Sequence, residues 1–161
     1  MKTKSTLANP NKNRSPRRRS REFALQALYQ WLISQDDVSG IIEDTRSAHG
    51  FDKADADHFA SLVSGTVRDA VALRVKIEPH LDRTFDELSP VEHAILLLGA
   101  HEFASHPDIP YRVVINEAVE LTKSFGGVDG HKFVNGVLDK LAAKMRVSEM
   151  NADRNSKEAQ T

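Results

Sequence analysis

The chain has 161 residues, of which 40% are hydrophobic and 28% are charged, and its formal net charge is −1. This length and composition are typical of one globular domain with one sizeable core. The chain contains no cysteine, which excludes a disulfide framework, a cysteine-based zinc site and a thiol nucleophile. The longest apolar run, at 94–100, is far shorter than the roughly twenty residues that a membrane span needs.

The charge is distributed unevenly. Residues 1–21 carry eight lysines and arginines and no acid, so the remaining residues have a net charge of −9. A basic arm on an acidic body indicates a polyanionic partner, although a solubilising tail or an organelle transit peptide has a similar composition. Cleavage of a transit peptide here would damage the first helix, because the arginines run directly into it. We expect residues 1–16 to be a disordered basic arm.

The hydrophobic period is helical from about residue 17 onward. One apolar stripe predicts a helix over about 17–35, and neighbouring isoleucines indicate a short helix over about 38–48. A further stripe predicts a long helix from about residue 54, with a break near Arg74. Pro79 ends or kinks the segment that follows.

Capping signals mark the second half of the chain. Ser89, Pro90 and Glu92 fit an N-cap, a first-turn proline and a capping box, at the start of a helix that ends near residue 104. Another apolar stripe follows and ends with Phe125, before two glycines that stop the helix. Asp129 is the expected N-cap of the last helix.

These patterns predict an all-α fold of about seven helices. We expect two small helical bundles, one over about 17–82 and one over about 83–146, packed into one compact domain. Residues 147–161 are polar and charged, so we expect a flexible tail there.

Sequence motifs for catalysis are absent: the chain has no G-x-G-x-x-G, no P-loop and no G-x-S-x-G. Seven histidines are scattered without an H-E-x-x-H pattern. The glycine-rich segment 125–130 follows a helix, so it fits a helix stop better than a phosphate loop, although the next helix N-terminus suits a phosphate. We expect no catalytic residue, no cofactor and no metal.

The start of the first helix combines cations with an aromatic residue. Arg17, Arg18, Arg19 and Arg21 carry guanidinium groups, which bind phosphate bidentately and stack on bases. Tyr29 lies off the centre of the apolar stripe. It is either a platform for an unstacked base or a residue at the edge of the core.

The last helix begins with a similar combination. Lys132 and Phe133 follow Asp129 directly, and a basic residue beside an aromatic one fits nucleic acid. The alternative is that Phe133 belongs to the edge of the core. The sequence thus offers two candidate contacts for a polyanion, one at each end of the helical region.

Three segments resemble a known family. RRRSREFALQALYQW, YRVVINEAVELTKSFGG and HKFVNGVLDKLA are similar to the bacterial transcription antitermination factor NusB, in the same order and from about Arg17 to about Arg146. The resemblance implies a cytoplasmic, non-enzymatic, all-helical protein. It implies binding of the boxA element of nascent ribosomal RNA jointly with NusE, a small-subunit ribosomal protein. It also implies a complex with RNA polymerase and other Nus factors that suppresses termination.

The resemblance further implies which residues contact the partners. The family's RNA-contact segment corresponds to the four arginines, and positions on or near the RNA surface correspond to Asp129, Lys132 and Phe133. Tyr29 and Glu92 correspond to positions on the RNA or NusE surface, with the partner of each left open. The presence of a glutamate at position 92 is explained equally well by its role in the capping box of its own helix.

Two other classes of function fit parts of the sequence. One is an RNA-binding accessory domain of an RNA-modifying system, although the chain lacks the Rossmann motif of a methyltransferase. The other is a helical scaffold with a solubilising basic tail. The sequence also leaves open a homodimer in the absence of RNA. At position 93 a lysine would also fit the resemblance, and His93 would make any phosphate contact there weaker or pH-dependent.

Overall fold

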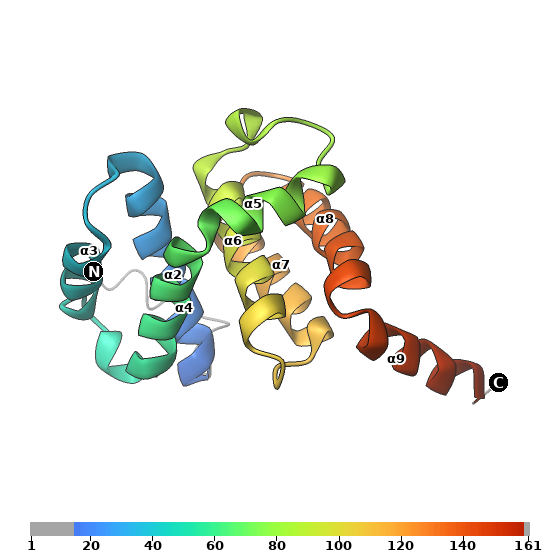
Figure 1. Cartoon of the computed structure of the whole chain (residues 1–161). Coiled ribbons are helices and arrows are strands. Elements are labelled where there is room, and N and C mark those ends of the chain that lie inside the picture. Colours follow the sequence, from blue (N-terminus) through green and yellow to red (C-terminus); the bar gives the residue numbers. More distant parts are fainter. Residues whose placement is uncertain (1–14, 160–161) are drawn as a thin grey trace.

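The structure is a computed structural model that describes residues 15–159, and this part of the chain is helical without any strand (Figure 1). The all-α prediction is confirmed. The α-helices number eight in the described range rather than about seven. They are α2 (Pro16–Ser34), α3 (Val38–Arg46), α4 (Ala56–Arg68), α5 (Ala70–Ile77), α6 (Pro90–Ser105), α7 (Tyr111–Phe125), α8 (Gly130–Met145) and α9 (Val147–Ala159). Three short 3₁₀ helices join them: η1 (Phe51–Lys53), η2 (Glu78–His80) and η3 (Phe85–Glu87).

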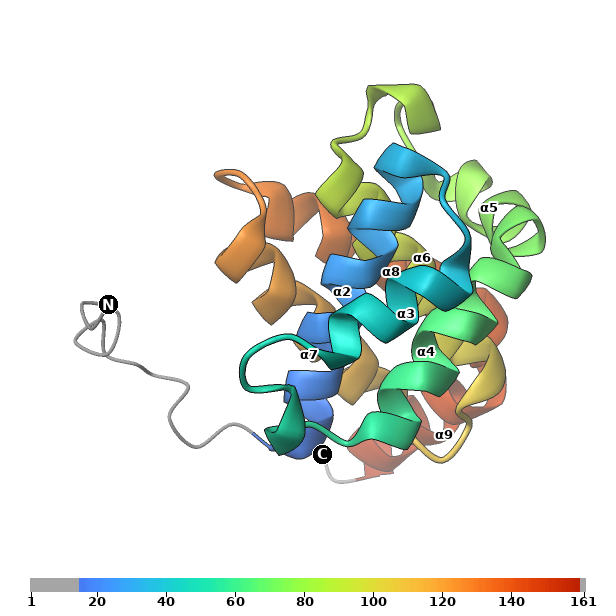
Figure 2. The same ribbon diagram turned by 90° about the vertical axis from the view of Figure 1, so that its left-hand side faces the viewer.

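The centre of the fold is α6, which is buried at every position from Ala94 to Phe103. A helix that is apolar all round has no solvent face, so it must be surrounded by other helices. Accordingly, α2 and α4 pack against it on one side, and α7 and α8 on the other (Figures 1 and 2). Leu138 of α8 lies so close to Gly99 that a Cβ there would be 3.1 Å from its methyl groups.

The helices α2, α3 and α4 gather at one end of the molecule and face the viewer in Figure 2. Phe51 links them by edge-to-face ring contacts, 5.2 Å from Phe23 and 5.0 Å from Phe59. Ser20 of α2 donates a hydrogen bond to the carbonyl oxygen of Asp55 and accepts one from its N–H. These contacts fix the start of α2 against the start of α4.

The break in the long predicted helix lies at Asp69, between α4 and α5, and not near Arg74. The backbone of Asp69 leaves helical geometry, with φ −101° and ψ 12°. The apolar stripe continues across the break, because Leu73 and Ile77 of α5 are buried like the apolar residues of α4. Periodicity alone therefore could not locate the break.

Residues 147–159 differ from the expected flexible tail, because they form α9. No residue of α9 is buried. Half-buried Met150 packs against the core, and polar contacts join the helix to the start of α7: Glu149 accepts a hydrogen bond from the N–H of Tyr111 at 2.9 Å, and Asp153 accepts from its hydroxyl at 3.1 Å. Asp153 also pairs with Arg112. A helix attached by carboxylates leaves no apolar stripe in the sequence.

The rest of the predicted basic arm, residues 1–14, lies outside the described residues. Within residues 15–159, no helix is long and apolar enough to cross a membrane.

Candidate nucleic-acid interface

The predicted arginines occupy the first two turns of α2. Ser15 is the N-cap, and its hydroxyl accepts a hydrogen bond from the N–H of Arg18 at 3.1 Å, while Pro16 stands at the first helical position. The first turn contains no acid. Cations at a helix N-terminus oppose the helix dipole by about 0.3–1 kcal/mol each, so the helix dipole does not explain why four arginines stand here. Their position points to a ligand.

The four arginines have different surroundings. The side chain of Arg17 is 49% exposed and lies 4.0 Å from the carboxylate of Asp55. Arg19 is half-buried, and no ion pair joins it to another residue between 15 and 159. The guanidinium of Arg18 makes two hydrogen bonds to Glu117 of α7, at 2.7 and 3.0 Å. The hydrogen bond to Glu117 raises the pKa of Arg18, which stays charged.

Arg21 differs from the expectation of an exposed phosphate contact. Only 5% of the residue is exposed, and its guanidinium binds the buried carboxylate of Glu102 at 2.8 and 2.9 Å. Burial acts against its charge, but the bonds to Glu102 outweigh burial and raise the pKa of Arg21. A signal was present in the sequence, because Arg21 lies three and four residues before Ala24 and Leu25, on the buried stripe.

Tyr29 lies near the other end of α2 and is 43% exposed. It lines a shallow cavity of about 220 Å³ together with Leu25, Gln26, Val91 and Phe125. Phe125 was predicted as the last core residue of its stripe, yet it is 45% exposed. It is the last residue of α7, where no further turn covers it. Tyr29 and Phe125 therefore form an aromatic surface that the sequence pattern did not indicate.

The helices α2 and α7 run in the same direction along this face. Arg18 meets Glu117 near their first halves, and Tyr29 shares a cavity with Phe125 at their far ends. Tyr29 lies eleven residues beyond Arg18, which places it on the same side of α2 and about 16 Å further along a helix that rises 1.5 Å per residue. The arginines and the aromatic surface are thus two ends of one elongated strip.

The loop that starts α8 lies beyond this aromatic end. Asp129 is the N-cap residue of α8, as predicted, but its backbone is left-handed with φ 65° and its side chain makes no capping hydrogen bond. Its carboxylate lies 3.7 Å from the ammonium of Lys132, and both side chains are at least 70% exposed. Gly130 is buried, and a Cβ there would lie 2.9 Å from Oε2 of Glu92. The structure therefore brings Glu92 and the start of α8 together.

Glu92 also takes part in the predicted cap of α6, since its N–H donates to the hydroxyl of Ser89 at 3.1 Å. Its carboxylate, however, is directed toward α8. Because free N–H groups at a helix N-terminus attract anions, a carboxylate beside Gly130 lowers the attraction of this point for phosphate. The neighbouring cations are then the stronger attraction for an anionic ligand.

Phe133 is half-buried and carries a cation on its ring. The guanidinium of Arg83 lies 4.2 Å from the ring centroid, a cation–π contact. Arg83 also binds Asp82 at 2.7 Å. Sequence reasoning missed Arg83, because it stands in the loop between η2 and η3, and nothing in its own neighbourhood indicates that this loop reaches α8.

His93 is not available to a phosphate in this structure. Its Nε2 accepts a hydrogen bond from Arg74 at 3.1 Å. Burial, together with the charge of Arg74, lowers the pKa of His93 to about 4, so it is neutral at physiological pH. The expected pH-dependent contact at this position is therefore not supported.

Comparison with known proteins identifies the family. Residues 18–143 match the NusB family. The chain belongs to the NusB family. It is 57% identical over 141 residues to the transcription antitermination protein NusB of Cupriavidus pinatubonensis, covering 88% of this chain and 84% of that protein. It is 58% identical over 139 residues to that of Paraburkholderia phymatum, covering 86% of this chain and 96% of that protein.

Solved structures agree in fold. The chain matches a crystal structure of the antitermination factors NusB and NusE in complex with dsRNA with a TM-score of 0.70 and 26% identity, over 78% of this chain and 95% of that one. The solution structure of NusB from Aquifex aeolicus matches with a TM-score of 0.71 and 27% identity, over 83% and 90% of the two chains. The NusB match ends at residue 143, so α9 lies beyond it.

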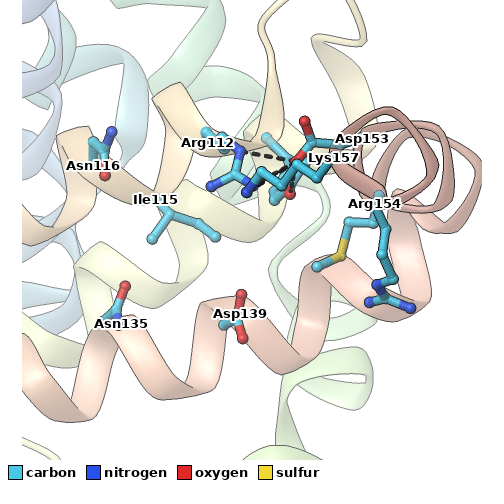
Figure 3. A pocket seen from close by; sticks show the side chains of 10 residues that line it. Arg112, Ile115, Asn116, Asn135, Asp139, Asp153, Arg154 and Lys157 are labelled. Atoms are coloured by element: carbon cyan, nitrogen blue, oxygen red, sulfur yellow. Dashed lines mark hydrogen bonds and ion pairs between the residues drawn. The ribbon is translucent and has the colours of Figure 1, made fainter. Parts of the chain in front are cut away.

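A second cavity, of about 300 Å³, lies between α7, α8 and α9 (Figure 3). It is polar, with Asn116 and Asn135 on one side and the pair of Arg112 and Asp153 on the other. None of the predicted site residues lines it. Across residues 15–159, no group of three histidine or acidic side chains could hold a metal ion.

Proposed function

We propose that this chain is a non-catalytic transcription antitermination factor that acts in the cytoplasm. In this proposal it binds a boxA-type element of nascent ribosomal RNA together with NusE, and joins RNA polymerase and other Nus factors in a complex that resists termination. Family membership, the names of relatives more than half identical, and a related structure holding NusE and RNA support it. The observation that carries it is the group of arginines at the start of α2, where Arg17 is 49% exposed and Arg19 has no ion pair within residues 15–159.

The two ends of the strip suit different partners. Arg17, Arg18 and Arg19 offer guanidinium groups for phosphates, so RNA is the better partner for this end. The cavity at Tyr29 and Phe125 is mainly apolar and suits a side chain of NusE or a single unstacked base. Arg21 in this proposal positions α2 and does not itself touch RNA.

The start of α8 forms a second RNA contact in the proposal. Lys132 is exposed, and Phe133 with Arg83 provides a stacked ring and guanidinium beside it. Asp129 and Glu92 place two carboxylates at the same point. We infer that these carboxylates orient the neighbouring cations. They also repel RNA phosphates whenever the RNA strand is shifted from its correct position on this surface.

The test is a gel-shift titration with boxA RNA and with a scrambled RNA of the same length, with and without NusE. We expect a preference for boxA that NusE strengthens. Replacing Arg17 and Arg19 by alanine should weaken boxA binding about tenfold or more, and should lower the salt slope by about 1.4, because two phosphate contacts to a single strand are lost.

The matched control is Arg68→Ala combined with Arg154→Ala, which removes two exposed arginines from α4 and α9. Circular dichroism should show unchanged helicity in both double variants. Equal loss of affinity in the control would contradict the assignment of the strip. An absence of any boxA preference with NusE present would contradict the proposed function itself.

A further inference from the structure

A third cavity has a different chemistry from the proposed RNA strip. This basic groove has a volume of about 610 Å³ and lies where the end of α5 and η2 come beside α8 (Figure 1). Its apolar lining is provided by Pro79, Ala104, Leu141 and Met145. Lys76 and Lys144 stand on opposite sides of it.

The charge of the basic groove is not neutralised. Neither Lys76 nor Lys144 forms an ion pair with any residue between 15 and 159, and the same holds for Lys140, one turn earlier on α8. His80 also lines the groove, and its pKa is lowered first by burial and then by the charges of Lys144 and Lys140. No acid opposes these effects at His80.

These lysines without ion pairs differ from exposed arginines of the same molecule, which do form ion pairs. Arg68, Arg83 and Arg112 each bind a neighbouring aspartate. On a body whose net charge beyond residue 21 is −9, three lysines without an ion pair form a positive region. The pKa of Asp82 is lowered first by its hydrogen bond with Arg83 and also by the charge of Lys140, so this carboxylate lies near the region. Such a region attracts acidic groups from outside the chain.

Two exposed valines of α5 enlarge the apolar surface next to the basic groove. Val71 and Val75 of α5 are 75% and 65% exposed, and they are one turn apart on the same helix. They occupy the row next to Lys76, because successive residues of a helix are separated by 100°. Single exposed valines are common, but a pair beside an apolar groove enlarges the area that a ligand can cover.

We propose that the basic groove binds an acidic, amphipathic segment of a protein partner, whose apolar side chains enter the groove and whose carboxylates meet Lys76, Lys140 and Lys144. An amphipathic helix laid into an apolar groove is a common mode of peptide recognition. RNA fits less well, because the groove contains no arginine and no phenylalanine, tyrosine or tryptophan on which a base could stack.

The groove is separate from the second proposed RNA contact, at the start of α8. Lys144 lies twelve residues after Lys132 on α8, about 18 Å along the helix. A partner in the groove and RNA at the start of α8 can therefore bind at the same time, and the inference does not depend on the proposed function.

The test uses the full chain labelled with ¹⁵N and a synthetic helical peptide of leucine, phenylalanine and glutamate. A second peptide carries glutamine in place of glutamate, and boxA RNA is the third ligand. We expect the acidic peptide to shift the amide signals of residues 76–80 and 140–145. Lys76→Glu combined with Lys144→Glu should weaken its binding about tenfold or more and leave boxA binding unchanged.

Two matched controls define the result. Arg46→Glu with Lys53→Glu makes the same change of charge on α3 and η1, and should leave the peptide affinity unchanged. Ala104→Gln fills the groove and should weaken binding, whereas Ala152→Gln on α9 should not. The inference is overturned if the acidic peptide gives no shifts at the groove, if the glutamine peptide binds as well, or if boxA RNA shifts these residues instead.

Discussion

Two buried arginines hold the two ends of the described chain, and they are neutralised in different ways. Arg21 of α2 binds the side-chain carboxylate of Glu102. Arg146, which precedes α9, donates to backbone carbonyl oxygens at the end of α6 and in the following loop. These oxygens belong to Glu102, Phe103, His106 and Ile109, at 2.9 to 3.2 Å. Both ends are therefore fastened to the same turn of α6.

The difference shows what a buried guanidinium requires. A full charge in the interior needs either an opposite charge or several oriented dipoles. Arg21 takes the first solution, whereas Arg146 combines both, because it pairs with Glu149 at 2.6 Å and also uses the partial negative charge at a helix C-terminus. Losing Arg21 would leave a buried carboxylate unpaired, whereas losing Arg146 would leave neutral carbonyl groups unsatisfied.

The largest effect is expected at the ion pair. Arg21→Met should reduce the free energy of unfolding by about 3–5 kcal/mol, because it leaves the charge of Glu102 buried without a partner. Urea denaturation followed by circular dichroism measures it. Arg21→Met with Glu102→Leu should recover part of the loss. Arg68→Met, at an exposed ion pair, should leave stability nearly unchanged, and an equally small effect of Arg21→Met would contradict a buried charge at Glu102 that depends on Arg21.

A smaller effect is expected at the dipole-bound arginine. Arg146→Met should reduce the free energy of unfolding by about 2–4 kcal/mol, because several buried carbonyl groups lose their donor. Hydrogen exchange should also show lost protection of the α9 amides, since Arg146 binds Glu149. Arg154→Met, on the exposed face of α9, is the control. Unchanged α9 protection in Arg146→Met would show that α9 is held by its contacts to α7 alone.

The smallest effect concerns pH, at histidines beside the same end of α6. The ring of His106 lies 5.2 Å from that of His101 and 5.4 Å from that of His58. Burial is the main cause that lowers the pKa of His58 and of His101 to about 4. The unfolded chain therefore binds more protons between pH 6.5 and 4, so stability is complete above pH 6.5 and falls as the pH drops toward 4.

We expect a loss on the order of 1 kcal/mol for each of these two histidines between pH 6.5 and 5. Urea titrations at a series of pH values measure it. His101→Gln should make the pH dependence shallower, whereas exposed His49→Gln should leave it unchanged. A stability that is constant from pH 7 to 5 would contradict neutral burial of these rings.

Most helices could be predicted from the sequence, because an amphipathic helix repeats its apolar residues every 3.6 positions and this signal is local. The start of α6 was predicted correctly at Pro90, since the cap of Ser89 is also local. The start of α9 at Val147 was not, because the partners of Glu149 and Asp153 lie about forty residues away. Local patterns carry no information on such contacts.

The candidate site likewise has features with a local sequence signal and features that depend on contacts between distant segments. The sequence located the arginines and the residues at the start of α8, which are contiguous. It did not indicate that Arg83 would reach Phe133, or that Phe125 would stand exposed beside Tyr29. The burial of Arg21 was available from its position on the stripe, but the neighbouring arginines suggested an exposed group.

The missing side chain of Gly130 has a consequence for how this surface can evolve. The nearest atom to a Cβ at this position is the terminal oxygen of Glu92, the flexible end of its side chain. Adding one methyl group to α8 would thus displace a carboxylate carried by α6, without changing any charged residue. Selection can in this way redistribute charge on the surface through a neutral substitution on another helix.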